Sequence, residues 1–229
     1  MPNIETRWWW VRHAPVPDGG CIYGQSDLDC DCGDVAVFNA LAKELPHGAV
    51  WITSNLARTR QTAAAIKVAA EGRYDGPDPT PIAALAEQHL GAWQGMNRAE
   101  FLAGRANQRH PFWFGLASER PPGGETFAEL TARVAGAITE LNDAHRGRDI
   151  VAVTHGGTIR AALAMALGIA PDAALAFVIE NCSITRLDQL NVDGRAYWRV
   201  NAVNHRPWGP GAQVPDHPAS RGQRSGTNR

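Results

Sequence analysis

The sequence predicts an α/β fold: a three-layer α/β/α sandwich with a mainly parallel central sheet and a small helical cap insertion. Three short apolar runs of strand length lie along the chain, at about residues 7–13, 49–53 and 150–154. The second and third runs are each followed directly by a stretch of helical character, over 55–71 and 157–168. Strands that alternate with helices are typical of a mainly parallel sheet covered by helices on both faces.

The first half of the chain contains the elements that begin this alternation. Short apolar runs bounded by polar or turn residues indicate the strands, and the longer stretches between them suit helices. The expected elements are, in order, strand 7–13, a loop to about residue 32, helix 33–45, strand 49–53, helix 55–71 and a strand near 81–85.

The second half begins with the expected cap insertion, at about residues 96–122, where Pro111, Pro121 and Pro122 break the helical pattern. A long helix then starts at Thr126, because Thr126 and Glu129 have the spacing of a capping box. The remaining expected elements are the rest of this helix to about 145, strand 150–154, helix 157–168 and strands near 175–180, 183–189 and 196–203.

Composition indicates one enzyme-sized domain over residues 1–204. The chain has 229 residues, of which 44% are hydrophobic and 20% charged, and this is enough to bury a full core. A formal net charge of −1 gives no electrostatic bias toward nucleic acid. Residues 205–229 are rich in Pro, Gly, Ser and Arg with almost no aliphatic residues, so we expect a disordered tail.

The sequence indicates no membrane segment, and we expect a cytoplasmic protein. The N-terminus lacks a basic segment followed by a long apolar one. The apolar stretch 161–179 is interrupted by Gly168, Pro171 and Asp172, so its uninterrupted apolar part is too short to span a membrane. The four cysteines fit neither a zinc site nor a disulfide framework and are expected to be reduced thiols; they are Cys21, Cys30, Cys32 and Cys182.

Polar residues end two of the predicted strands and mark a candidate site. The first strand ends in Arg12 and His13, and the strand over 150–154 is followed by His155. A cation beside an imidazole is costly to bury unless something pairs with it, so an anionic ligand is expected there. Ligands in open α/β sheets bind at the carboxyl ends of strands, which is where these side chains lie.

Four motifs resemble the histidine phosphatase superfamily, the phosphoglycerate mutase-like group, and they occur in the order found in that family. A Gly-Gly-Glu-Thr-Phe segment over 123–127 precedes the late helix, as in the family. The motifs are Val-Arg-His-Ala at 11–14, Ser-Asn-Leu-Ala-Arg-Thr-Arg-Gln-Thr-Ala at 54–63, Leu-Ala-Glu at 85–87 with Gly-Ala-Trp-Gln-Gly at 91–95, and Thr-His-Gly-Gly at 154–157.

The resemblance implies a phosphohistidine mechanism, and the residue types suit phosphoryl transfer. His13 would be the nucleophile, kept neutral by neighbouring guanidinium groups. Arg12 and Arg58 would bind the phosphate, because the arginine fork matches phosphate oxygens bidentately. Arg60 is expected to point away, since residues two apart on a helix do not share a face. His155 would donate a hydrogen bond to the phosphate.

Three further sets of residues complete the expected site. Gly156 and Gly157, with the helix start that follows them, would let an anion approach backbone N–H groups. Glu87 would be the general acid and base that protonates the leaving group and then activates water. The residues expected to touch the rest of the substrate are Tyr23, Gly24, Trp93 and Trp113. The cycle needs neither a metal nor a cofactor.

The favoured function is therefore hydrolysis of a small phosphorylated metabolite, by the chain alone or as a homodimer. A segment over 21–27, Cys-Ile-Tyr-Gly-Gln-Ser-Asp, resembles part of the α-ribazole phosphatase-like members, so α-ribazole phosphate or a sugar phosphate are candidate substrates. A mutase is the second alternative. The resemblance implies a longer insertion between the acid and the Gly-Gly-Glu segment in mutases of this group, so the short segment from Glu87 to Gly123 favours hydrolysis. The third is a non-catalytic module that binds a phosphorylated ligand.

Overall fold

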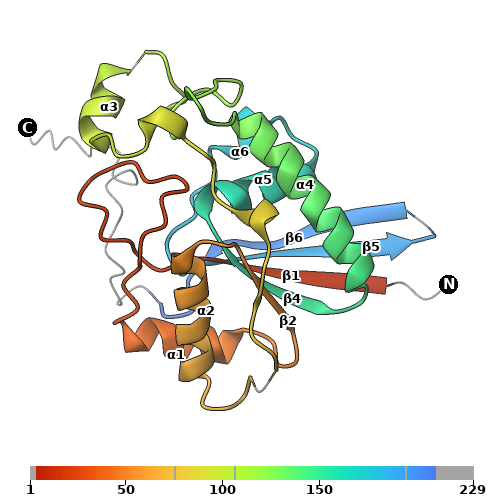
Figure 1. Cartoon of the computed structure of the whole chain (residues 1–229). Coiled ribbons are helices and arrows are strands. Elements are labelled where there is room, and N and C mark those ends of the chain that lie inside the picture. Colours follow the sequence, from red (N-terminus) through yellow and green to blue (C-terminus); the bar gives the residue numbers. More distant parts are fainter. Residues whose placement is uncertain (1–3, 75, 106, 194, 210–229) are drawn as a thin grey trace, which may run out of the picture.

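The computed structural model describes residues 4–74, 76–105, 107–193 and 195–209 (Figure 1). In this part of the chain, six strands form one sheet in the order β3-β2-β4-β1-β5-β6. The strands are β1 (Ile4–Arg12), β2 (Val50–Thr53), β3 (Thr80–Pro81), β4 (Asp149–Thr154), β5 (Ile184–Val192) and β6 (Arg195–His205). The helices are α1 (Val35–Glu44), α2 (Ala57–Ala69), α3 (Arg98–Gly104), α4 (Phe127–Ala144), α5 (Gly156–Leu167) and α6 (Pro171–Ala174), with short 3-10 turns at Ala83–Leu85 and Gly91–Trp93.

The central sheet is mixed. β1 runs parallel to β4, and β2 runs parallel to both β3 and β4. β5 and β6 form an antiparallel pair, and β5 is also antiparallel to β1. The parallel part is the part expected from strand–helix alternation, and the last two strands add an antiparallel edge to it. The carboxyl ends of β1, β2 and β4 therefore point to the same edge of the sheet.

Helices cover both faces of the sheet, as Figure 1 shows. Alternate residues of a strand point to opposite faces. In β1, Trp8 and Trp10 pack on the side of α4 and α5, with their rings stacked 4.7 Å apart. Val11 packs on the other side, in the cluster that contains the buried faces of α1 and α2. The three-layer sandwich predicted from the sequence is confirmed.

Helix α4 begins as the capping box predicts. The Thr126 hydroxyl oxygen accepts a hydrogen bond from the Glu129 backbone N–H at 3.0 Å, and Glu129 Oε2 accepts one from the Thr126 backbone N–H at 2.9 Å. These two bonds satisfy N–H groups that a helix start leaves without partners. The helix then buries one apolar face, which includes Leu130 and Val134, against the sheet.

The strand expected near 81–85 is much shorter than predicted. β3 contains only Thr80–Pro81, which pair with the end of β2, and a 3-10 turn follows over Ala83–Leu85. Proline has no N–H to donate to a neighbouring strand, so Pro81 limits the length of this edge. The turn leads the chain toward Glu87.

The strand expected near 175–180 is wrong. After α6 the chain continues through a turn and an irregular segment that does not join the sheet. The carbonyl oxygen of Phe177 accepts a hydrogen bond from Arg160, and that of Ile179 accepts one from Arg12. The apolar residues here resemble a strand in sequence, but their backbone carbonyls bind guanidinium groups instead of a neighbouring strand.

The expected cap insertion over about 96–122 contains α3 and a series of turns. It contacts the loop after β1 through two backbone hydrogen bonds, from Ile22 N to Met96 O at 2.9 Å and from Arg98 N to Gly20 O at 2.8 Å. A small apolar cluster lies beneath it and is made of Ile22, Leu90 and Trp93, with Phe101 and Phe114 packed against them. The cap and the loop after β1 therefore form one unit at the carboxyl edge of the sheet (Figure 1).

The described chain continues past the expected domain boundary at residue 204. His205 is the last residue of β6, and Trp208 packs against the cluster that contains α1. The first residues of the expected tail thus belong to the packed structure. Residues 210–229 lie outside the described residues.

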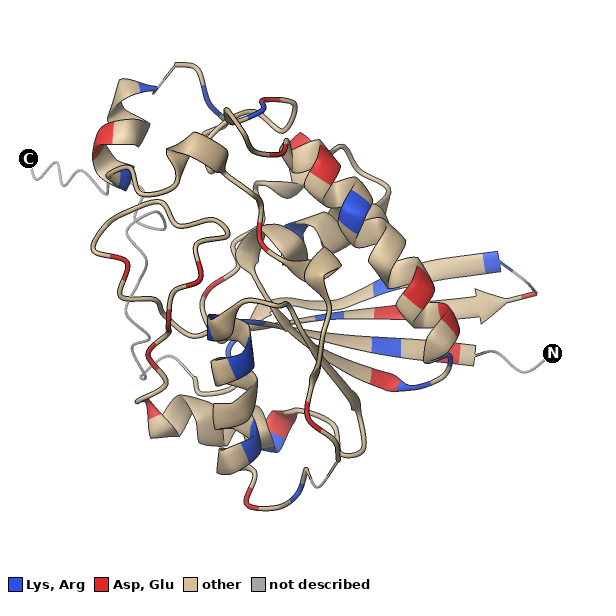
Figure 2. Ribbon diagram, viewed as in Figure 1, with Lys and Arg blue, Asp and Glu red and all other residues tan. Residues whose placement is uncertain are grey.

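Charges and cysteines show the following pattern in the described chain. Residues of both charges are spread over the ribbon (Figure 2). No described helix is long and apolar enough to cross a membrane. All four cysteines are free thiols, and the sulfur atoms of Cys30 and Cys32 lie 3.6 Å apart.

Candidate active site

The polar residues predicted at the strand ends meet at one edge of the sheet. Arg12 and Thr154 are paired in the register of β1 and β4, so the residues that follow them, His13 and His155, come out side by side. Their ring centroids lie 5.2 Å apart. Both imidazoles are almost completely buried. This edge is therefore the candidate active site.

Arg58, in the first turn of α2, is fully buried beside His155. Its Nε donates to His155 Nδ1 at 3.3 Å, Nη1 donates to the carbonyl oxygen of Ser26 at 2.8 Å, and Nη2 donates to that of Gly24 at 2.6 Å. Burial lowers the pKa of Arg58, but its usual value is so high that the group stays protonated. A buried cation held mainly by neutral acceptors is a strong attraction for an anion.

His155 is held as a neutral imidazole. Arg58 can only donate, so Nδ1 of His155 accepts, and the ring proton is on Nε2, which lies 2.7 Å from the Ser54 hydroxyl. Burial, followed by the charge of Arg58, lowers the pKa of His155 well below its ordinary value. The predicted hydrogen bond from His155 to a phosphate therefore needs a proton on Nδ1.

The backbone around His13 fixes the orientation of its ring. Nδ1 lies 2.7 Å from the carbonyl oxygen of Ala14, which can only accept, so Nδ1 carries the proton and the lone pair is on Nε2. The Asn181 side chain donates to the carbonyl oxygen of His13 at 2.8 Å. The N–H of Ala14 donates to the Thr62 hydroxyl at 2.8 Å. The sequence analysis did not identify Asn181 or Thr62, which act on the backbone of this segment.

Glu87 lies at the N-terminus of α5. Its Oε2 accepts a hydrogen bond from the Gly157 N–H at 3.1 Å, and Oε1 accepts one from the Gln88 N–H at 2.9 Å. A Cβ atom on residue 157 would lie 2.1 Å from Oε1, so only glycine leaves room for this carboxylate. The two glycines were expected from the sequence to admit an anionic ligand, but the group that lies against Gly157 is the side chain of Glu87.

Arg133 and Glu125 hold the loop that carries Glu87. The Arg133 guanidinium donates to the carbonyl oxygens of Ala84 and Ala86, and it pairs with Glu125 at 2.5 Å. Glu125 Oε1 also accepts the N–H of His89 at 2.9 Å. The Gly-Gly-Glu-Thr segment thus acts on the site indirectly, by positioning the acid.

Arg12 extends from the end of β1 toward the irregular segment after α6. Its Nη1 donates to the carbonyl oxygen of Ile179 at 2.6 Å, while its buried Nε has no hydrogen-bond partner among the described residues. A Cβ on Gly156 would lie 3.5 Å from that Nε. Gly156 therefore allows the guanidinium to lie against the start of α5.

Arg160 lies at the site but was not predicted from the sequence to belong to it. It lies one turn after Gly156 on α5, and a Cβ on Gly156 would lie 3.1 Å from its Nη1. Its Nε donates to the carbonyl oxygen of Phe177 at 2.9 Å, and its guanidinium lies 5.0 Å from the centre of the Trp113 ring. The i, i+4 spacing from Gly156 to Arg160 was a signal in the sequence that could have identified it.

The four expected substrate contacts divide into two groups. Tyr23 lies near His13, with 6.3 Å between ring centroids, and the carbonyl of Gly24 binds Arg58. Trp113 borders the site, where its Nε1 donates to Gln88 Oε1 at 2.8 Å. Trp93 instead packs in the cap cluster and is 6% exposed.

Arg60 differs from Arg58, as the helix spacing predicts. It is exposed, and its Nη1 donates to the carbonyl oxygen of Asn55 at 2.6 Å. Among the described residues, no group of three or more His, Cys, Asp or Glu side chains is arranged to hold a metal ion.

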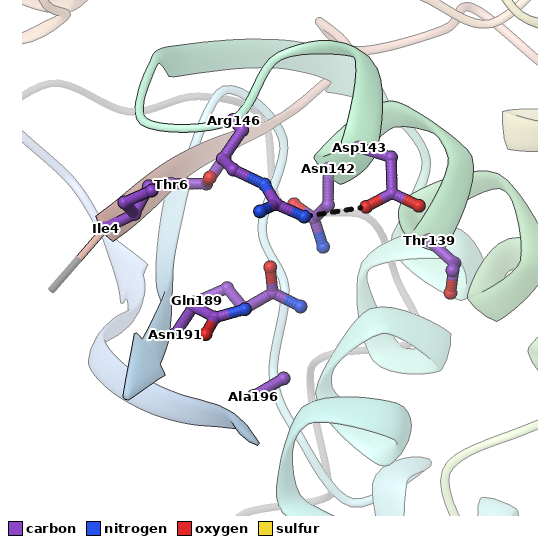
Figure 3. A pocket seen from close by; sticks show the side chains of 9 residues that line it. All are labelled: Ile4, Thr6, Thr139, Asn142, Asp143, Arg146, Gln189, Asn191 and Ala196. Carbon is purple, nitrogen blue, oxygen red and sulfur yellow. Dashed lines mark hydrogen bonds and ion pairs between the residues drawn. The ribbon is translucent and has the colours of Figure 1, made fainter. Parts of the chain in front are cut away.

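A separate cavity of about 210 Å³ lies between α4 and the amino end of β1 (Figure 3). It is lined by Ile4, Thr6, Thr139, Asn142, Asp143, Arg146, Gln189, Asn191 and Ala196. Figure 3 shows Arg146 pointing to Asp143, at 3.4 Å. None of the predicted catalytic residues borders this cavity, so it is distinct from the candidate active site.

Comparison with known proteins gives consistent matches. The model of the histidine phosphatase superfamily (branch 1) matches residues 8–204. A glucosyl-3-phosphoglycerate phosphatase of Mycolicibacterium vanbaalenii is 34% identical over 71% of this chain and 74% of that protein. A 2,3-bisphosphoglycerate-dependent phosphoglycerate mutase 2 of Gloeobacter violaceus is 33% identical over 79% of this chain and 77% of that one. The structure of a mycobacterial glucosyl-3-phosphoglycerate phosphatase with VO3 matches with a TM-score of 0.72 and 26% identity, over 87% of this chain and 98% of that one.

Proposed function

The chain belongs to the histidine phosphatase superfamily (branch 1), and from this premise we propose that it hydrolyses a small phosphorylated metabolite through a phosphohistidine on His13. The observation that carries the proposal is the meeting of two imidazoles and the buried guanidinium of Arg58 at one sheet edge. A phosphoryl group in transfer spreads negative charge over its oxygens, so catalysis depends on positioning and on positive charge. Both are supplied by this arrangement.

In the first step, Nε2 of His13 attacks phosphorus and the bond to the leaving oxygen breaks. The proton on Nδ1 is held toward the Ala14 carbonyl, so the lone pair that makes this attack is on Nε2. Arg12 and Arg58 stabilise the phosphoryl oxygens, and Glu87 gives a proton to the leaving alkoxide. The products of the step are the free alcohol and phosphohistidine.

In the second step, water attacks the phosphohistidine. Glu87, now a carboxylate, takes the proton from this water, so inorganic phosphate leaves and His13 returns to its neutral form. The hydrogen bonds that Glu87 accepts from the N–H groups of Gln88 and Gly157 hold its carboxyl group in place for this step.

A mutase is the second candidate, because several relatives are named as known or probable phosphoglycerate mutases. A mutase must return the phosphoryl group to substrate and keep water away from phosphohistidine. The segment from Glu87 to Gly123 is short and contains one described helix, α3, which favours hydrolysis. Phosphoryl exchange between positions of a phosphoglycerate, without comparable phosphate release, would favour the mutase.

The third candidate is a module that binds a phosphorylated ligand without catalysis. It requires that Glu87, the proposed general acid, lie away from the phosphate site. Glu87 is instead anchored at the start of α5, beside the residues around His155. This position supports catalysis. Binding of phosphorylated ligands with no phosphate release from any substrate of a broad panel would still favour the module.

The test is a panel of phosphomonoesters that includes α-ribazole phosphate and sugar phosphates, assayed with a chelator present. We expect phosphate release by the wild type and a loss of turnover on the order of a thousandfold or more in His13→Ala. An Arg60→Ala variant, which removes an exposed arginine of α2, serves as the matched control. Equal turnover in wild type and His13→Ala would overturn the proposal.

A further inference from the structure

We propose that Arg160 binds a carboxylate on the organic part of the substrate, so that the site prefers phosphomonoesters of small carboxylic acids. The inference rests on the proposed function and names the substrate class of that same site. The residues that the motifs assign to phosphate binding include Arg12, Arg58 and His155. Arg160 is not one of them.

Two guanidinium groups come together at the first turn of α5. A Cβ atom on Gly156 would lie 3.1 Å from Nη1 of Arg160 and 3.5 Å from Nε of Arg12, so the two guanidinium groups flank this position. Both arginines are anchored on neighbouring backbone carbonyls, those of Phe177 and Ile179. The irregular segment after α6 thus fixes both side chains at the same place.

These two positive charges have no carboxylate paired with them. Within the described part of the chain, neither Arg12 nor Arg160 forms an ion pair, whereas arginines such as Arg133 and Arg98 do. Burial, together with the charge of Arg12, lowers the pKa of Arg160 to about 10, so it remains protonated at neutral pH. Two adjacent cations, both partly buried, favour the binding of more than one anionic group.

Arg160 lies on the leaving-group side of the site. The general acid must reach the leaving oxygen, and Glu87 is anchored on Gly157, in the same turn of α5. Trp113 lies under the Arg160 guanidinium, and its indole N–H is bound by Gln88, the residue next to Glu87. Arg160 and Trp113 therefore border the space where the organic part of the substrate continues beyond the leaving oxygen.

The geometry of Arg160 suits a carboxylate. Its Nε donates to the Phe177 carbonyl and its Cζ lies 5.0 Å from the centre of the Trp113 ring, while its Nη groups donate no hydrogen bond to any described residue. The Nη groups can donate two parallel hydrogen bonds to a carboxylate. Arg58 differs, because each of its Nη groups already donates one hydrogen bond to a carbonyl of the loop after β1.

The test uses pairs of substrates that differ only at the carboxylate. The pairs are 3-phosphoglycerate with glycerol 3-phosphate, and phosphoserine with phosphoethanolamine. We expect the wild type to prefer the carboxylate-bearing member of each pair by about tenfold or more in kcat/KM, as one charge-assisted hydrogen-bonded pair allows. Arg160→Gln is expected to bring each ratio close to one, mainly by raising KM for the acid.

Two further variants separate recognition from a structural role. Arg160→Lys keeps the charge but loses the fork, so it should retain part of the preference. Arg146→Gln removes an exposed arginine from the turn after α4 and should leave the ratios as in the wild type. A merely structural role for Arg160 would lower kcat/KM equally for both members of a pair and leave the ratio unchanged, which would overturn the inference.

Binding measurements keep the inference testable if the chain does not hydrolyse these esters. Calorimetry with His13→Ala should give tighter binding of 3-phosphoglycerate than of glycerol 3-phosphate, and Arg160→Gln added to it should remove the difference. Failure of hydrolysis with this pattern intact would count against the proposed function alone. Equal binding of both ligands, or a stronger preference for a bisphosphate such as fructose 1,6-bisphosphate over its monophosphate counterparts, would overturn the carboxylate assignment.

Discussion

Gly157 shows how the absence of one side chain shapes the site. The carboxylate of Glu87 occupies the volume in which a Cβ on residue 157 would lie, 2.1 Å from Oε1. We expect Gly157→Ala to displace this carboxylate and to lower kcat/KM on the order of a hundredfold, the lower end of what a general acid contributes. Steady-state kinetics on a small phosphomonoester measures this.

The matched control for that variant is Gly136→Ala. Gly136 is exposed within α4, and an added Cβ would have no atom within 4 Å. This change should leave kcat/KM unaltered and raise the free energy of unfolding by about 0.5–1 kcal/mol, because alanine suits a helix interior better than glycine. If Gly157→Ala kept wild-type kinetics, the assigned contact between Glu87 and α5 would be unimportant for turnover.

His155 predicts a pH dependence of stability. Its pKa in the folded protein is lowered well below the ordinary value of 6.5, mainly by burial, so the unfolded chain takes up a proton that the folded chain excludes. The free energy of unfolding should therefore fall as pH drops from 7 to 5, by up to about 1.4 kcal/mol per pH unit from this group. Urea unfolding at a series of pH values measures it.

The comparison variant is His155→Gln, which has no titrating ring at this position. Its free energy of unfolding should depend less steeply on pH over the same range, even if it is lower at every pH. Curves of equal slope for the two proteins would mean that His155 is not the group responsible.

At the scale of the elements, the capping box at the start of α4 has a measurable effect. Thr126→Ala removes the acceptor for the Glu129 N–H and should destabilise the protein by about 1 kcal/mol. Thr139→Ala is the matched change inside the same helix, at an exposed position, and should be neutral or slightly stabilising. Urea midpoints of the two variants test this, and equal midpoints would contradict a role for the cap.

The elements with strong local signals were predictable from the sequence. The capping residues of α4 mark its start, and the apolar runs that end in Arg12 and before His155 mark β1 and β4. His13 and His155 follow from these elements because strand ends in a parallel sheet share one edge, whereas the role of Arg58, on α2, came from the family resemblance. Local chemistry therefore sufficed for the two imidazoles of the site.

The elements that depend on distant contacts were not predictable in the same way. The segment 175–180 has the apolar content of a strand, yet its carbonyls bind Arg160 and Arg12, and no local pattern records this. The glycine at position 157 was expected to admit a ligand, whereas its neighbour in space is Glu87, far away in sequence. Trp93 likewise packs in the cap cluster because of contacts with the loop after β1.

At the scale of the whole molecule, the site depends on the complete fold. His13, Arg58, Glu87 and His155 come from segments spread over most of the described chain and meet only when β2, β4 and β1 are paired. Turnover and tryptophan fluorescence should therefore be lost at the same urea concentration, because Trp8 and Trp10 report on the core beside β1. Loss of turnover at a clearly lower concentration would show that the site opens locally before the core unfolds.

The orientation of β1 also matters for practical work with the enzyme. The strand starts at Ile4 and delivers His13 at its other end, after nine residues of extended chain. A tether attached ahead of Ile4 would thus join the molecule roughly 30 Å from His13, given the rise per residue of a strand. Surface immobilisation through the amino terminus should therefore keep the catalytic imidazole away from the support.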